Sequence, residues 1–101
     1  MSLRRTHRIE PITINGIKVV QIIIDSHYEK KHSDHIDDAL ILKLVRKLDG
    51  RFELPETTTG VYSYFSTLVE YKSKQYRLIW LLEDNALYIG VVNAFRDRRK
   101  D

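Results

Sequence analysis

The sequence contains no cysteine, so a disulfide framework, a thiolate zinc site and a cysteine nucleophile are all excluded. It also has no apolar run close to the roughly 20 residues that are needed to cross a bilayer. The N-terminus lacks the apolar stretch of a signal peptide. These absences predict a cytoplasmic protein that makes no contact with a membrane.

Glycine is scarce, and the 4 glycines are scattered along the chain, so the sequence forms no phosphate-cradling loop. Ser26, Ser33 and Ser66 stand in no nucleophile-elbow context, and serine hydrolysis therefore has no support. We predict that the protein uses no cofactor.

What the chain does contain is typical of a small globular protein. Its 101 residues, of which 43% are hydrophobic, predict one domain that spans residues 1–101. The net charge of +3 is concentrated at two basic tails, residues 1–8 and 96–101, because the residues between them carry more anions than cations. Basic ends favour an anionic partner, of which nucleic acid is the usual candidate, whereas the alternative is a pair of solvated tails.

The N-terminal half contains a hairpin signal and a helix signal. In ITINGIKVVQIII, Asn15-Gly16 separates two β-branched runs and predicts strands at about residues 9–14 and 17–24. The stretch SDHIDDALILKLVRKLDG predicts one long helix over residues 33–50, with Ser33 or Asp34 as its N-cap.

Three strand-like runs follow in quick succession, over residues 61–71, 75–83 and 87–95. The turns KSK and DNA between them are short, which predicts an antiparallel meander. The expected fold class is therefore α+β: an antiparallel sheet with an N-terminal hairpin and one main helix packed on one face.

Histidines and aspartates gather in DSHYEKKHSDHIDD, which holds His27, His32 and His35. These side chains can ligate metals, but their spacing matches no established signature, so we predict no metal site. A metal-dependent hydrolase that uses this cluster is kept as a third hypothesis. His27 or His32 is also a candidate acid or base, because imidazole titrates near neutrality.

Two aromatic residues are candidates for binding bases. On one strand Tyr62 and Tyr64 share a face, whereas Phe65 points to the other side. The two tyrosines form either a stacking platform for bases or a half-buried face of the sheet.

Arg77 is the most informative charged residue, since it lies among apolar neighbours in YRLIWLL. A charge in such a place requires a partner. Glu70 or Glu83 would be a structural partner, and a phosphate would be a functional one.

The stretch YRLIWLLEDNALYIGVVNAFRDRRK resembles the last two strands of RelE- and HigB-type toxins, which are ribosome-dependent ribonucleases. The resemblance covers residues 61–100 and implies a RelE-like protein that binds or cleaves RNA on the ribosome and pairs with an antitoxin-like protein. It implies that Arg77 holds phosphate and that Arg96, Arg98 or Arg99 is the basic residue after the last strand. Our working hypothesis gives catalytic roles to Arg77, Arg96 and Arg98, and contacts with RNA phosphates to Lys72, Lys74 and Arg99.

The chain departs from the pattern of that family. Leu68 and Glu70 stand where RelE-type enzymes carry lysines, no terminal helix with a catalytic tyrosine follows the last strand, and a hairpin replaces the helical opening. The alternative hypothesis is a non-enzymatic interaction protein, such as a homodimer that pairs through an exposed sheet edge or the N-terminal hairpin.

Overall fold

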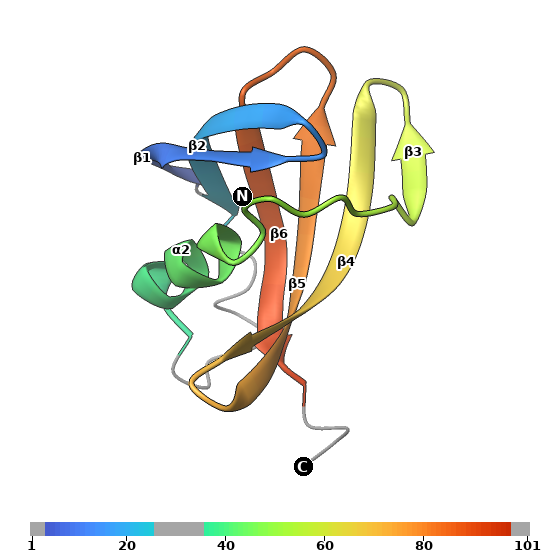
Figure 1. Ribbon diagram of the computed structural model, residues 1–101. Helices are drawn as coiled ribbons and strands as arrows, with labels where there is room; N and C mark the ends of the chain where they lie inside the picture. Colours follow the sequence, from blue (N-terminus) through green and yellow to red (C-terminus); the bar gives the residue numbers. More distant parts are fainter. Residues whose placement is uncertain (1–3, 26–35, 98–101) are drawn as a thin grey trace.

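Six strands form one sheet in the computed structural model, which describes residues 4–25 and 36–97, and one helix packs on that sheet (Figure 1). In chain order, the elements are β1 (Arg4–Ile14), β2 (Ile17–Asp25), α2 (Asp38–Arg46), β3 (Thr57–Thr59), β4 (Tyr62–Tyr71), β5 (Lys74–Glu83) and β6 (Tyr88–Arg96).

The N-terminal hairpin is confirmed. Asn15 and Gly16 both have positive φ, 54° and 75°, as a two-residue type I′ turn requires, and Ile14 pairs with Ile17 across the turn. The first strand begins earlier than predicted, because Arg4 already pairs with Asp25 of β2. The arginines that the sequence suggested as part of a basic tail therefore belong to β1.

The prediction of a purely antiparallel sheet is wrong. The strand order is β1-β2-β6-β5-β4-β3, and β2 pairs with β6 in parallel, with Ile22 opposite Ile89. The meander of β4, β5 and β6 is antiparallel as expected. The parallel contact arises because the apolar β2 lies inside the sheet. β1 pairs with one edge of β2, and β6, the last strand of the meander, pairs with the other. Sequence spacing contains no signal for that long-range contact.

The helix is shorter than predicted. α2 begins at Asp38 and its N-cap is Asp37, whose carboxylate accepts a hydrogen bond from the backbone N–H of Leu40 at 2.9 Å. The predicted caps, Ser33 and Asp34, lie outside the described residues. Residues 47–50 form turns that end with Gly50 at a φ of 83°, a conformation that favours glycine.

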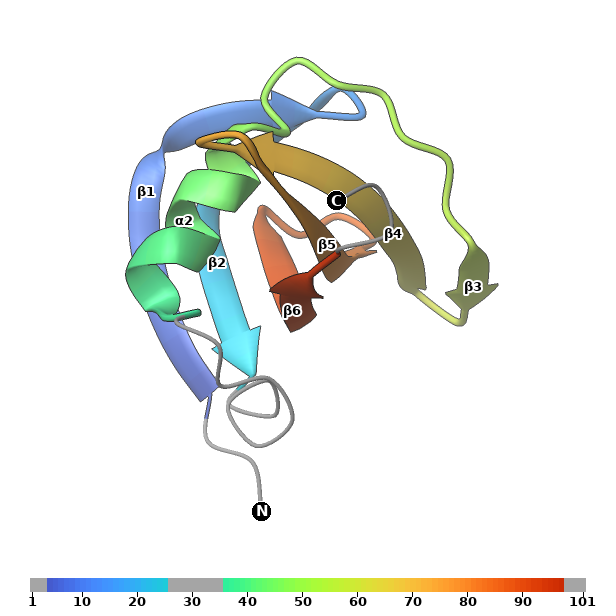
Figure 2. The ribbon, with the colours of Figure 1, turned by 90° about the horizontal axis from the view of Figure 1, so that it is seen from below.

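The core lies between α2 and one face of the sheet. Leu44 and Leu48 on the helical side are fully buried, together with Ile22 and Leu78 of the sheet. Trp80 is also buried, and its ring stacks on Phe65 with the centroids 4.0 Å apart. Figure 2 shows that the sheet curves and that α2 lies beside β1 and β2.

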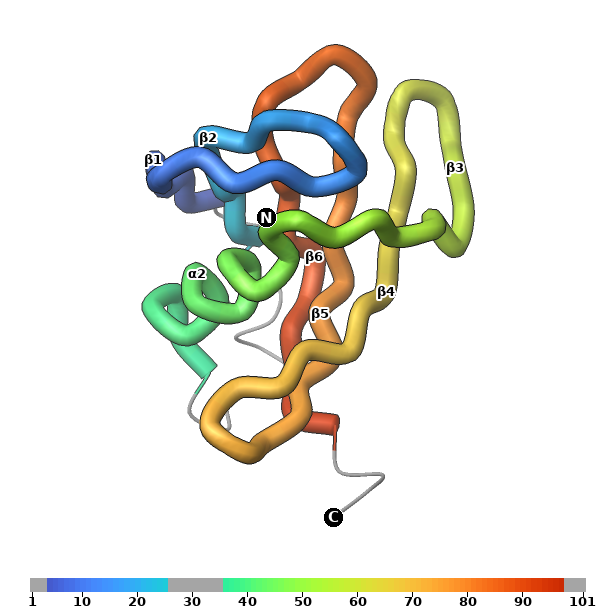
Figure 3. The backbone as a smooth tube through the Cα atoms, viewed as in Figure 1, coloured from blue at the N-terminus to red at the C-terminus, as the bar shows by residue number. Residues whose placement is uncertain are grey.

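The segment between α2 and β3 crosses the sheet on the helical side, as the tube in Figure 3 shows. Its path is held by Asn15, whose side chain bonds both the backbone N–H and the carbonyl of Glu53, at 2.6 and 3.0 Å. The hairpin turn therefore anchors the crossing, and β3 is delivered to the far edge of the sheet.

Candidate functional site

The two faces of the sheet differ, and we name them the helix face and the open face. On β5, Tyr76, Leu78 and Trp80 are buried on the helix face, while Arg77 and Leu81 alternate onto the open face and are half-buried. Within residues 4–25 and 36–97, no helix lies over the open face (Figure 1).

Arg77 has a partner directly after the end of β6. Its Nη2 lies 3.2 Å from Oδ2 of Asp97, whose side chain is 8% exposed. Asp97 is held in register by its backbone N–H, which donates to the carbonyl of Gln75 at 2.9 Å. The partner is thus neither Glu70 nor Glu83. The sequence did not indicate Asp97, because it predicts a basic tail over residues 96–101.

Arg77 and Arg96 lie on opposite faces of the sheet. Arg96 is directly opposite Tyr76, which points to the helix face, whereas Arg77 is opposite Phe95. Two strand positions that differ by one in register direct their side chains to opposite sides. The structure therefore does not bring these two arginines together into one phosphate site. Arg98 and Arg99 lie outside the described residues.

A cluster of lysines surrounds Tyr71, the last residue of β4. The Nζ atoms of Lys72, Lys43 and Lys47 lie 5.5, 5.9 and 6.0 Å from the centre of the Tyr71 ring. Each is within reach of a cation–π interaction with the ring. We call these four residues the Tyr71 cluster. It gathers three positive charges from a helix, a helix end and a hairpin turn.

The predicted phosphate-binding lysines lie at this cluster. Lys72 belongs to it, and Lys74 is directly opposite Tyr71 in the β4–β5 pairing. Sequence reasoning missed Lys43, Lys47 and Tyr71. The four-residue spacing of Lys43 and Lys47 was a usable signal, since residues four apart lie on one side of a helix.

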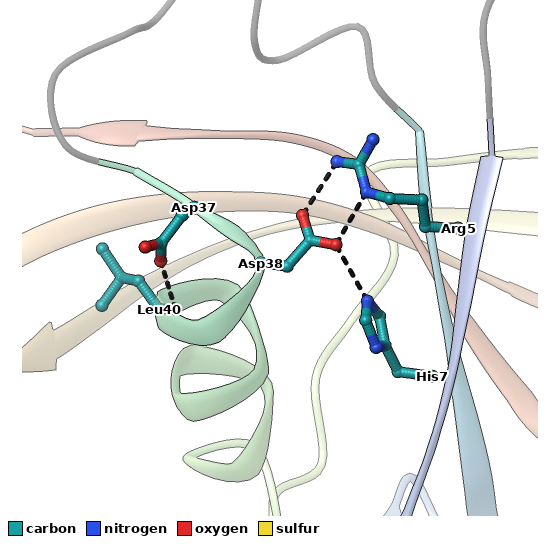
Figure 4. Close-up of polar contacts among 5 residues, drawn as sticks. All are labelled: Arg5, His7, Asp37, Asp38 and Leu40. Atoms are coloured by element: carbon teal, nitrogen blue, oxygen red, sulfur yellow. Dashed lines mark hydrogen bonds and ion pairs between the residues drawn. The ribbon is translucent and has the colours of Figure 1, made fainter.

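A second polar group connects β1 to the start of α2 (Figure 4). Nε and Nη2 of Arg5 donate to the two carboxylate oxygens of Asp38 at 2.7 and 2.8 Å, and Nε2 of His7 lies 2.9 Å from Oδ2. The carboxylate also lies in the first turn of α2, where the helix dipole favours negative charge. This geometry attaches the helix to the edge of the sheet.

A histidine oriented by a carboxylate can also act as a proton carrier. His7 has that arrangement, which no sequence pattern indicates, because Asp38 is 31 residues away. The histidines proposed as acid or base, His27 and His32, lie outside the described residues. In the described ranges, no group of three or more metal-binding side chains comes together.

The sheet edges bear on the homodimer hypothesis. β1 and β3 are the outer strands of the sheet in the described part of the chain. β1 carries Pro11 and an irregular register between Arg8 and Ile12, and β3 has only 3 residues. Proline, irregular pairing and shortness all discourage pairing with another chain. These edges therefore do not favour pairing of two copies, and homodimer formation stays a prediction.

Comparison of the chain with protein-family models, curated proteins and solved structures found no match. The relationship to RelE- and HigB-type toxins accordingly stays a prediction. In the part of the chain that the structure describes, no helix has the length and apolar character needed to span a membrane.

Proposed function

We propose that this protein binds single-stranded RNA through the Tyr71 cluster, and that it does so in the cytoplasm. The observation that carries the proposal is the presence of three lysine Nζ atoms within 5.5 to 6.0 Å of one tyrosine ring. Three ammonium groups held around one ring form a concentrated positive field that only an anion neutralises well.

The chemistry of the cluster suits RNA better than a small anion. Lysine binds phosphate as a point charge without strict geometry, which fits a flexible backbone with many equivalent phosphates. The half-buried ring of Tyr71 lies at the centre of those charges. Single-stranded nucleic acid is bound through this combination of cations and aromatic rings.

The proposal is for binding and does not include cleavage. A ribonuclease of the RelE type would use Arg77 to hold the scissile phosphate, but the guanidinium of Arg77 is 3.2 Å from the carboxylate of Asp97. An arginine paired with a buried carboxylate has a structural function that is sufficient to explain its presence.

The test is a titration with a uridine oligonucleotide at several salt concentrations. The double variant Lys43→Gln/Lys72→Gln should bind about 10-fold or more weakly at low salt, with the slope of log K against log salt reduced by about 1 to 1.5. The variant Arg77→Ala should retain the binding of the parent, since Arg77 lies on the other face of the sheet.

A matched control removes two exposed charges elsewhere. Arg8→Gln/Lys18→Gln lowers the net charge equally, but both residues are on the β1–β2 hairpin. The proposal predicts that this variant binds nearly as well as the parent. Equal weakening in both double variants, or no binding by the parent, would show that the Tyr71 cluster is not an RNA site.

A further inference from the structure

The open face of the sheet contains a cavity of about 260 Å³. Its centre is a row of residues paired across four strands: Ile23 of β2 is opposite Gly90 of β6, Gly90 is opposite Leu81 of β5, and Leu81 is opposite Tyr64 of β4. Gly90 adds no side chain of its own to this row. A Cβ at Gly90 would lie 3.0 Å from Cγ of Leu81, so Leu81 lies over the glycine.

Tyrosines surround this row. Tyr62, Tyr64 and Tyr88 all line the cavity, and the rings of Tyr62 and Tyr64 are tilted at 49° with their centres 6.5 Å apart. The hydroxyl of Tyr88 is held by Glu83, to which it donates at 2.7 Å. One anchored ring and two further rings thus flank an aliphatic floor, which is the lining that a flat ring system requires.

The charged side chains of the cavity come from the β1–β2 hairpin. Arg4 and Asp25, which are paired across the two strands, both line it. Arginine only donates hydrogen bonds and a carboxylate only accepts them, with room for several partners at its two oxygens. A ligand that contacts both would present acceptors to Arg4 and donors to Asp25.

We propose that this cavity binds a purine base, with its ring among the three tyrosines and its polar edge toward Arg4 and Asp25. Aromatic side chains stack on any base, and arginine is the side chain that most often recognises the acceptor edge of guanine. The proposal concerns a different face from the Tyr71 cluster and goes beyond the proposed RNA site. The base comes either from a free nucleotide or from an RNA strand.

Other occupants fit this cavity less well. A peptide strand is bound through free backbone groups at a sheet edge, but the four strands that form this floor are paired with one another. An acyl chain would leave the charges of Arg4 and Asp25 against hydrocarbon, which is unfavourable. The volume of about 260 Å³ is just below the range of about 300 to 1,000 Å³ that is usual for ligand pockets, and it suits one ring system.

The experiment titrates GMP into the full chain and follows the ring signals of its tyrosines by NMR. We expect the signals of Tyr62, Tyr64 and Tyr88 to shift, and the double variant Tyr62→Leu/Tyr64→Leu to bind about 5- to 150-fold more weakly. Phe52→Leu removes an aromatic ring that is 81% exposed and outside the cavity, so this control should bind like the parent. Gly90→Ala should also weaken binding, because Leu81 must move into the cavity.

Two further measurements are needed. One distinguishes a free nucleotide from an RNA strand as the source of the base, and the other distinguishes binding in the cavity from binding at the Tyr71 cluster. A guanosine-containing oligonucleotide that shifts the same tyrosines when GMP does not would place the base within RNA. Persistence of the GMP shifts in Lys43→Gln/Lys72→Gln shows binding that is independent of the Tyr71 cluster. The proposal is overturned if neither ligand shifts these tyrosines, or if the double tyrosine variant binds both as well as the parent.

Discussion

At the scale of single residues, the surroundings of Tyr88 on the open face change the pKa of its phenol. Burial, followed by the hydrogen bond to Glu83 and the negative charge of that carboxylate, raises the pKa of Tyr88 from 10.0 to about 12, although Arg4 opposes the shift. The folded protein therefore keeps this phenol neutral under conditions in which the unfolded chain would ionise it.

This pKa gives a prediction for alkaline stability. Between pH 10 and pH 12 the unfolded chain loses the proton of Tyr88 and the folded chain retains it. The contribution of Tyr88 is thus fully present below pH 10 and is lost as the pH rises through about 12. Tyr88→Phe should make the free energy of unfolding fall less steeply in this window than it does in the parent, as measured by urea denaturation. Parallel curves for the two proteins would contradict the prediction.

At the scale of elements, the β4–β5 hairpin contains a costly turn. Lys72 and Ser73 have φ angles of 52° and 67°, which residues with a side chain rarely adopt, and Tyr71 pairs with Lys74 on either side. Two-residue turns of this kind favour asparagine and glycine. The first hairpin has those residues and the second does not. Lys72 nevertheless places its charge beside the Tyr71 ring, so the less favourable turn supplies part of the Tyr71 cluster.

Replacing Ser73 by glycine should therefore stabilise the protein. Glycine adopts the left-handed conformation without strain, and the strain energy removed in this way exceeds the added entropy cost of ordering a glycine. We expect a gain of about 0.5 to 1 kcal/mol in the free energy of unfolding. The measurement is the urea midpoint at constant m-value. Ser63→Gly, within β4, is the matched control and should destabilise the protein. Loss of stability in both variants would disprove the account of the turn.

At the scale of the whole molecule, one carboxylate connects the helix to the sheet edge. Asp38 receives two hydrogen bonds from Arg5 and contacts His7, and these partners are 33 and 31 residues away in sequence. These contacts hold α2 against β1.

Asp38→Ala should lower the free energy of unfolding by about 1 to 3 kcal/mol, because it leaves a half-buried arginine without its carboxylate. Denaturant unfolding measures this loss. Asp84→Ala removes an exposed acidic residue from the turn after β5 and serves as the control. A loss no larger than that of the control would show that this ion-paired group contributes little to docking of the helix.

Sequence reasoning was most accurate where the signal is local. The Asn15-Gly16 turn, the three strands of the meander and the shared face of Tyr62 and Tyr64 follow from neighbouring residues and the two-residue period of a strand. It was least accurate for partners that are distant in the chain. The parallel contact between β2 and β6 and the pairing of Arg77 with Asp97 both depend on which strand lies beside which.

The sequence by itself determined the main elements of this protein: a hairpin, one helix and a meander, each indicated by turn residues and apolar periodicity. Only the tertiary structure decided where the charges and rings meet. It separated Arg77 from Arg96 onto two faces, gathered three lysines around Tyr71, and formed a tyrosine-lined cavity on the open face of the sheet. The physical reason is that burial of apolar surface selects one arrangement of the strands, and that arrangement sets every contact between distant side chains.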